Sequence, residues 1–144
     1  MMYTDGIINT LKATTNRLRP FTYNPDVPLA RKLNRDARFS FASGHVSGTA
    51  SVSWFTAKVI NDLYPNSKWR PAVWAGAVAI PGTVAWLRYR AGKHFPTDVA
   101  AGFAIGAAMG WLVPTLHKAS NDKLSLHMIP VRSGAGLGMR LRIG

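Results

Sequence analysis

The sequence predicts an all-α fold, a helical bundle that is partly transmembrane, with a short C-terminal β-hairpin. The observations behind it are uncharged apolar spans at residues 46–57, 71–87 and 99–116, short polar connections between them, and alternation near the end of the chain. With 144 residues the chain forms one domain at most. We expect the helical domain to cover residues 1–118 and the tail to cover residues 119–144.

The segment before the first apolar span is expected to begin with a helix that ends between Lys12 and Arg19. It lacks a long apolar stretch and a small-residue cleavage site, so it does not have the pattern of a signal peptide. Residues 21–41 contain two prolines, four basic residues and no clear period. We therefore expect a long ordered or semi-ordered loop whose basic side chains face solvent or lipid headgroups.

The three apolar spans differ in how well they suit a bilayer. Residues 46–57 should continue as helix to about Leu63, and their serines favour a buried position in a bundle. Residues 71–87 are near spanning length, with a kink expected at Pro81, and residues 99–116 reach the roughly 18 residues of a transmembrane helix. A buried helix in a small soluble bundle is the alternative for the last span.

Small residues in the last span predict close helix packing. Gly102, Gly106 and Gly110 recur every four residues, so one helix face carries no side chains and a neighbouring helix can approach it, as helices do in bilayers. In the tail, the alternation of Leu137, Met139, Leu141 and Ile143 with Gly or Arg predicts a strand, and residues 133–136 would turn a hairpin.

Composition points to an anionic partner. Eighteen Lys and Arg residues face six acidic residues, which gives a formal net charge of +12. Nucleic acid, anionic headgroups and phosphorylated small molecules all fit such a charge. Because the chain has no cysteine, a disulfide framework, a thiolate zinc site and a cysteine nucleophile are excluded.

The order of the helices predicts where the polar residues meet. If consecutive spans are antiparallel with short links, the start of the first span and the connection between the second and third spans lie at the same end of the bundle. That end would hold His45, the segment from Arg88 to Asp98, and the cations at the end of the N-terminal helix.

This end of the bundle has the residues of a phosphate site. Ser43 fits the N-cap of a helix that begins at Gly44, where free N–H groups and the positive end of the helix dipole bind anions. Arg19 and Arg88 each offer a planar fork of donors, and Lys12 adds a point charge. Simple helix capping by Ser43 is the alternative.

Two histidines and an aspartate could supply the chemistry. His94 and Asp98 are four residues apart, so a carboxylate in the first helical turn can hold Nδ1–H of the imidazole and leave Nε2 free as a nucleophile. His45 can then protonate the leaving oxygen. Asp98 as a simple first-turn acid, or a divalent metal bound by these three residues, are alternatives, although the neighbouring cations oppose a metal.

These residues fall into three patterns: Lys12, six residues and Arg19-Pro20; Ala42-Ser43-Gly44-His45; and Leu87-Arg88, five residues, His94, three residues and Asp98. They resemble the three patterns of the type 2 phosphatidic acid phosphatase (PAP2) superfamily, which are Lys-x6-Arg-Pro, Pro-Ser-Gly-His and Ser-Arg-x5-His-x3-Asp. Their order and spacing make the resemblance specific from Lys12 to about Leu116, and it is to the membrane-associated acid phosphatase branch.

The resemblance implies a bundle of the PAP2/haloperoxidase type and a metal-independent phosphatase that needs no cofactor. In similar enzymes the histidine that matches His94 forms a phosphohistidine, the aspartate that matches Asp98 orients it, and the histidine that matches His45 acts as general acid. The substrate would be a phosphomonoester or diphosphate, such as a lipid phosphate or another phosphorylated small molecule. The positions that hold the phosphoryl oxygens match Lys12, Arg19, Ser43, Gly44 and Arg88.

The chain departs from the family pattern in three ways. Ala42 replaces a proline and removes a rigid entry into the helix, while Leu87 replaces a serine whose hydroxyl in relatives could touch the phosphate. Only eleven residues precede Lys12, so we expect the chain to lack the first helices of membrane members of the family.

We expect a membrane protein, in the bacterial inner membrane, with the site facing the periplasm or the outside. Basic residues such as Lys58, Lys68 and Arg70 lie at the opposite end of the spans, as the positive-inside rule favours. No nucleic acid is expected as a partner, because tryptophans lie within apolar runs and not between basic residues. An inactive membrane remnant, a vanadium haloperoxidase-like enzyme and a basic nucleic-acid-binding module remain as alternatives.

Overall fold

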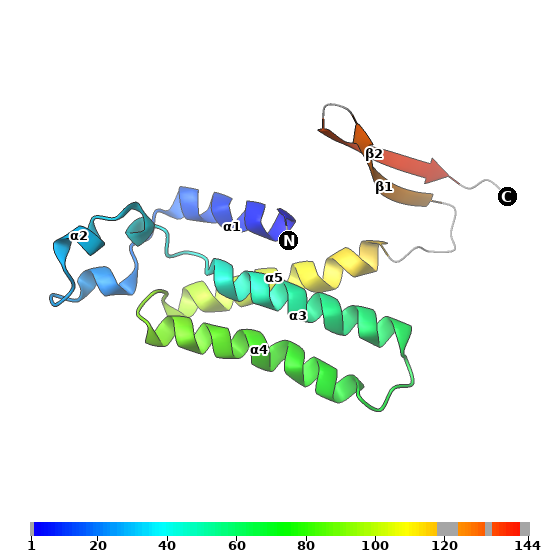
Figure 1. The fold of residues 1–144 in the computed structure, drawn as a ribbon, viewed down its shortest axis with the longest axis horizontal. Helices are drawn as coiled ribbons and strands as arrows, with labels where there is room; N and C mark the ends of the chain where they lie inside the picture. Colours follow the sequence, from blue (N-terminus) through cyan, green and yellow to red (C-terminus); the bar gives the residue numbers. More distant parts are fainter. Residues whose placement is uncertain (1, 118–123, 132–133, 142–144) are drawn as a thin grey trace.

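The computed structural model describes residues 2–117, 124–131 and 134–141. Its long helices are α1 (Met2–Thr15), α3 (Gly44–Leu63), α4 (Arg70–Arg90) and α5 (Pro96–His117). Helices α3, α4 and α5 form an antiparallel bundle, and α1 contacts α3 and α5 (Figure 1). The predicted helical bundle is therefore confirmed, with helices at all three apolar spans.

Helices α3 and α5 form the most extensive contact of the bundle. Backbone carbonyls of α3 lie directly against the glycines of α5. A methyl group built on Gly106 would lie 2.2 Å from the carbonyl oxygen of Ser47, and the corresponding distances are 2.6 Å from Gly102 to Ser43 and 2.4 Å from Gly110 to Ser51. Since no real Cβ approaches a carbonyl so closely, the four-residue glycine spacing is what allows these helices to touch.

The helices differ in how well they suit a membrane. Among the described residues, α5 is the one helix long and apolar enough to cross a bilayer, by length and composition. Pro81, the position of the expected kink, lies inside helix α4. Helix α4 exposes large apolar side chains on its surface, including Ile80, Trp86 and Leu87. Such an exposed apolar face would suit contact with lipid.

The connection from α1 to α3 contains short helices that the sequence did not predict. In place of one long loop, it forms the 3-10 helix η1 (Pro20–Tyr23), one turn of helix α2 (Leu29–Lys32) and the 3-10 helix η2 (Arg35–Arg38). Side chains supply part of this order, because Asn34 caps η2 by accepting a hydrogen bond from the N–H of Asp36. The position of this cap could not be predicted from composition alone.

The tail forms an antiparallel hairpin of β1 (Leu124–Val131) and β2 (Gly134–Leu141), paired from Leu124 opposite Leu141 to Val131 opposite Gly134. The predicted hairpin is present, but its turn was misplaced. Residues 134–136 belong to β2, and the connection at residues 132–133 lies outside the described residues, as does Ile143.

Candidate active site

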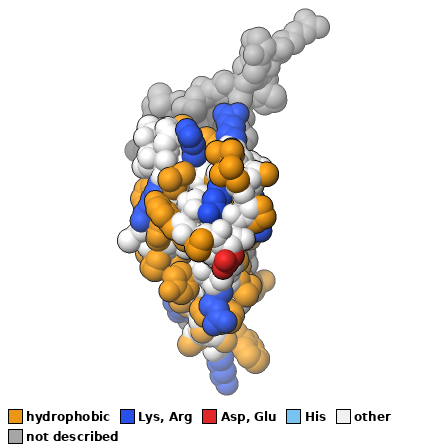
Figure 2. Space-filling model, turned by 90° about the vertical axis from the view of Figure 1, so that its left-hand side faces the viewer, with side chains coloured by type: hydrophobic (Ala, Val, Ile, Leu, Met, Phe, Trp, Pro, Cys, Tyr) orange, Lys and Arg blue, Asp and Glu red, His pale blue; other side chains and the backbone are white. Residues whose placement is uncertain are grey.

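The first turn of α3, the α4–α5 connection and the C-terminal end of α1 meet at one end of the bundle, at the left of Figure 1. We call this region the polar end. Figure 2 views the molecule from that side and shows Lys and Arg side chains spread between hydrophobic ones, with acidic side chains confined to a small area. The polar end comprises Lys12, Arg19, Ser43, Gly44, His45, Arg88, His94 and Asp98, the residues expected to converge.

Of the two histidines at the polar end, His94 is held more firmly than His45. Its side chain is only 2% exposed. Its Nδ1 lies 2.7 Å from the main-chain carbonyl oxygen of Ser40, whereas Oδ2 of Asp98 is 3.8 Å away. The prediction that the Asp98 carboxylate holds Nδ1 was therefore wrong, because the carbonyl oxygen of Ser40 is the partner. Because a carbonyl oxygen can only accept, the hydrogen of neutral His94 is assigned to Nδ1, and Nε2 carries a free lone pair.

The surroundings of His94 keep its imidazole neutral. Burial and the positive charge of Arg19 lower the pKa of His94 from 6.5 to about 4, against the opposing effects of the Ser40 hydrogen bond and Asp98. Burial disfavours the charged imidazolium, and a nearby cation adds to that effect. At neutral pH the ring is therefore in the form that a nucleophile requires.

Asp98 is completely buried in the first turn of α5 and is surrounded by donors. Its Oδ2 accepts hydrogen bonds from the Ser40 hydroxyl at 2.5 Å and from the N–H of Phe95 at 2.9 Å. Its Oδ1 accepts from Arg17 at 2.7 Å. Asp98 is thus linked to His94 by Ser40, whose hydroxyl contacts Asp98 and whose carbonyl oxygen contacts His94. The negative charge of Asp98 also raises the pKa of His94.

Arg17 and Ser40 also belong to the site, although the sequence patterns did not identify them. Arg17 also donates to the hydroxyl of Thr97 at 2.8 Å, and its guanidinium lies 4.2 Å from the ring centre of Phe95. Ser40 is aligned by its N–H, which donates to the carbonyl of Arg17. Arg17 lies only two residues before Arg19 of the first pattern, and Ser40 three before Ser43 of the second; proximity to these patterns was the available signal.

The three expected phosphate-binding cations gather around His45, which is exposed in the first turn of α3. Although His45 is exposed overall, partial burial of its imidazole lowers its pKa, and Arg88, Lys12 and Arg19 lower it further, in that order. The ammonium group of Lys12 lies 3.4 Å from the position of a methyl group built on Gly44. The positive charges therefore cluster where α3 begins, and a bound anion would be attracted there.

The two arginines differ in what occupies them. Within residues 2–117, the guanidinium of Arg88 has no hydrogen-bond or ion-pair partner, so its donors are available. Arg19 is buried and already donates to Asp36, from Nη2 to the carboxylate at 2.7 Å and from Nε to the carbonyl at 2.9 Å. The structure therefore brings both arginines to the polar end, but in different states.

Ser43 occupies the N-cap position of α3, as expected, but its hydroxyl makes no capping hydrogen bond. The hydroxyl is buried and has no hydrogen-bond partner among the described residues. Its main-chain N–H instead donates to the carbonyl of Asp98 at 3.0 Å, which ties α3 to α5. A buried hydroxyl without a protein partner at a helix N-terminus is available to donate a hydrogen bond to a bound anion.

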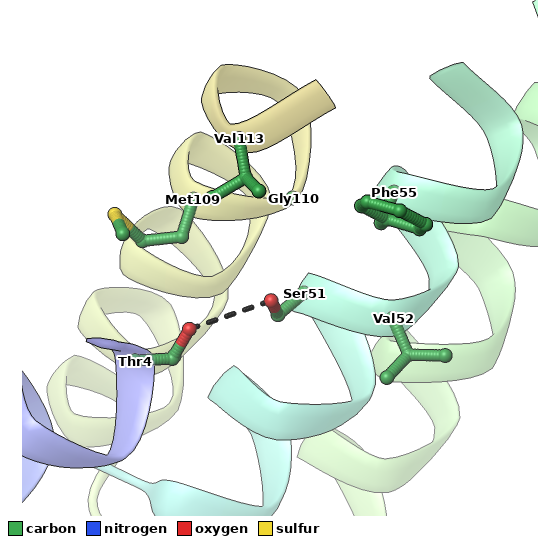
Figure 3. Close-up of a pocket in the computed structure, with 7 residues that line it drawn as sticks. All are labelled: Thr4, Ser51, Val52, Phe55, Met109, Gly110 and Val113. Carbon is green, nitrogen blue, oxygen red and sulfur yellow. Dashed lines mark hydrogen bonds between the residues drawn. The ribbon is translucent and has the colours of Figure 1, made fainter. Parts of the chain in front are cut away.

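A separate apolar cavity of about 260 Å³ lies between α1, α3 and α5, farther along the bundle (Figure 3). Its wall includes Phe55 and Met109, and the hydroxyls of Thr4 and Ser51 meet across it at 3.4 Å. None of the predicted site residues lines it.

In the described part of the chain, no group of three or more His, Cys, Asp or Glu side chains is arranged to hold a metal ion.

Comparison with known proteins gives a consistent family. The model of the PAP2 superfamily matches residues 1–122. The lipid A 4'-phosphatase of Porphyromonas gingivalis is 29% identical over 80 residues, which are 55% of this chain and 30% of that protein. The crystal structure of the first transmembrane PAP2 type phosphatidylglycerolphosphate phosphatase from Bacillus subtilis matches with a TM-score of 0.60 and 28% identity, covering 83% of this chain and 59% of that one. This chain thus spans less than two thirds of either relative.

Proposed function

The chain belongs to the PAP2 superfamily, and from that premise we propose that it hydrolyses a lipid phosphomonoester or diphosphate through a phosphohistidine at Nε2 of His94. The observation that carries the proposal is the state of His94. It is buried and neutral, it is fixed through Nδ1 by Ser40, and cations lie close to it.

In the proposed first step, the Nε2 lone pair of His94 attacks phosphorus and the bond from phosphorus to the leaving oxygen breaks. His45 donates a proton to that oxygen. Partial burial and the neighbouring cations lower the pKa of free His45. A bound phosphoryl group would offset those cations and favour the protonated form that a general acid needs.

In the second step, water attacks the phosphohistidine, the phosphorus–nitrogen bond breaks, and phosphate leaves. His45, now neutral, takes the proton from the attacking water. Meanwhile Arg88, Lys12, Arg19 and the start of α3 would hold the equatorial oxygens, where charge spreads in the transition state. Asp98 stabilises the positive charge that His94 carries in the intermediate.

A lipid substrate is supported by two lines of observation. Both relatives are named as phosphatases of lipid phosphates. The apolar helix α5 and the exposed apolar side chains of α4 suit a membrane, where the tail of a lipid could stay while its headgroup meets His94.

The proposal is tested with phosphate release from a panel of lipid phosphates and with trapping of an acid-labile phosphoenzyme. His94→Ala should abolish both. His45→Ala should still form phosphoenzyme from a substrate with an activated leaving group, because such a group needs no proton. Full turnover in either variant would refute the assignment.

Metal removal is a separate test of the proposal. Since Arg88, Arg90 and Lys93 oppose a bound cation, EDTA should leave activity intact. A loss of activity that zinc or magnesium restores would contradict this.

We also propose that the polar end faces the periplasm or the outside of an inner membrane. The chain contains no cysteine, so single cysteines can report its orientation. Ala91→Cys at the polar end and Asn66→Cys at the opposite end both replace exposed residues. In intact cells, a membrane-impermeant maleimide should label the first variant and not the second. The reverse pattern would place the site in the cytoplasm.

A further inference from the structure

The carboxylate of Asp36 is the group at the polar end that the proposed chemistry does not use. It accepts a hydrogen bond from Nη2 of Arg19 at 2.7 Å, although 60% of the Asp36 side chain is exposed. Asp98, the other carboxylate of the region, is buried among its own donors. Asp36 is thus an exposed anion bound to a buried cation.

Asp36 also acts on the neighbours of Arg19. Its negative charge raises the pKa of Lys12 and of His45, in opposition to burial and to the positive charge of Arg19, which lower both. The hydrogen bond from Arg19 places the carboxylate beside one of the cations proposed to bind the phosphoryl oxygens.

The position of Arg19 does not depend on this carboxylate alone. Nε of Arg19 donates to the main-chain carbonyl of Asp36 at 2.9 Å, and Nη1 donates to that of Lys93 at 3.4 Å. The N–H of Arg19 donates to the carbonyl of Ala37 at 2.9 Å, and Asn34 caps the same turn. If the Asp36 side chain turned toward solvent, these main-chain contacts could still hold the guanidinium in place.

We propose that the Asp36 carboxylate occupies, in the empty site, the place on Arg19 that a phosphoryl oxygen takes when substrate binds, and that Asp36 thereby selects phosphomonoesters over diphosphates. The proposal rests on the function proposed above and narrows its substrate class. A buried arginine needs a partner while the site is empty, and Asp36 supplies it. In the proposed exchange, an incoming phosphoryl group displaces that carboxylate.

The preference for a monoester follows from charge. After displacement Asp36 remains on η2, close to the bound anion, and like charges repel more strongly when the anion carries more charge. A diphosphate brings a second anionic group to the same entrance. Removing the charge of Asp36 should therefore improve the binding of a diphosphate more than that of a monophosphate.

The test is direct calorimetric titration of the purified full chain in detergent with orthophosphate and with pyrophosphate. Asp36→Asn and Asp36→Ser remove the charge in two ways, and both are titrated once thermal unfolding matches the wild type. Asp26→Asn is the matched control, because Asp26 is an exposed aspartate of the same connection whose side chain does not contact Arg19. Asp36→Glu keeps the charge.

We expect the neutral Asp36 variants to bind orthophosphate about threefold and pyrophosphate about tenfold more tightly than wild type, since one charge-assisted competitor is gone. Asp26→Asn and Asp36→Glu should stay near wild type. Unchanged or weaker binding in the neutral variants would overturn the proposal, as would an equal gain in Asp26→Asn. Because binding of these inorganic anions does not depend on hydrolysis of a lipid, a chain that hydrolyses no lipid phosphate but shows this gain would refute the proposed function alone.

Discussion

The α3–α5 interface and the polar end are both closely packed, but different atoms hold them together. At the interface, carbonyl oxygens of α3 lie against three glycines of α5, and any added methyl group would collide with them. At the polar end, the side chains of Arg17 and Ser40 and the main-chain N–H of Phe95 donate hydrogen bonds to the buried carboxylate of Asp98.

The difference shows two ways in which this fold can fail. The interface depends on the absence of side chains, so it should be damaged by adding atoms. The polar network depends on a buried charge with three hydrogen bonds, so it should be damaged by removing that charge. Substitutions in each region, paired with a control outside it, separate these two dependences.

The largest effect is expected from Asp98→Asn, which breaks the polar network. The amide would place a donor where Asp98 now accepts from Ser40, Phe95 or Arg17, and would leave Arg17 without its counter-charge. Losing one partner of a buried pair costs about 3–5 kcal/mol, and we expect about 3 because Arg17 is 38% exposed. Chemical denaturation would measure it.

The same substitution should also lower kcat by more than it raises KM, because Ser40 would no longer be fixed and the orientation of His94 would loosen. Asp26→Asn removes an exposed aspartate and should change neither stability nor kcat. A variant at Asp98 with the stability and kcat of wild type would show that the network is not needed.

At the interface, Gly106→Ala is expected to destabilise the bundle by about 1–3 kcal/mol, the usual cost of overpacking a close contact. The new methyl group would lie 2.2 Å from the carbonyl oxygen of Ser47, so the two helices would have to separate. Gly82→Ala in α4 is the control, because nothing lies within 4 Å of the added methyl group. There alanine should stabilise the helix by up to about 1 kcal/mol. Equal effects at both positions would contradict the role given to the glycines.

The same contrast explains how much the sequence could predict. Glycines spaced by four residues specify a helix face directly, and the order of three apolar spans places His45, Arg88 and His94 at one end. By contrast, the partner of Nδ1 in His94 depends on the path of the connection before α3, which brings Ser40 to it. The hydrogen bond that Arg19 donates to the Asp36 carboxylate depends on a 3-10 turn capped by Asn34. The spacing of His94 and Asp98 predicted a hydrogen bond between Nδ1 and the carboxylate. In the structure, the carbonyl oxygen of Ser40 takes the place of that carboxylate.

The burial of His94 predicts a dependence of stability on pH. The imidazole has a pKa of about 4 when folded and about 6.5 when unfolded. Between these values the unfolded chain binds more protons, so stability should fall as pH drops from about 6.5 to about 4 and should lose nothing further from this group below that range. Above pH 6.5 His94 contributes no pH dependence.

The measurement is thermal unfolding of wild type and His94→Gln across this pH range. Other titrating groups contribute to both proteins, so their difference isolates His94. We expect wild type to lose stability relative to the variant as the pH falls. A constant difference would mean that His94 titrates normally in the folded state.

The smallest effect concerns the two states of the arginines at the polar end. Vanadate can adopt the trigonal-bipyramidal shape of phosphoryl transfer, so it should inhibit competitively and bind more tightly than phosphate. Arg88→Lys keeps the positive charge but loses the planar fork of N–H donors. Because the Arg88 guanidinium contacts no hydrogen-bond or ion-pair partner within residues 2–117, the substitution breaks no such protein contact. Vanadate affinity should then fall by about tenfold, the loss of one charge-assisted hydrogen bond. Arg35→Lys, in η2, makes the same chemical change at an exposed position and should leave the inhibition constant unchanged. If both variants lose affinity equally, vanadate responds to surface charge and the anion binds away from Arg88.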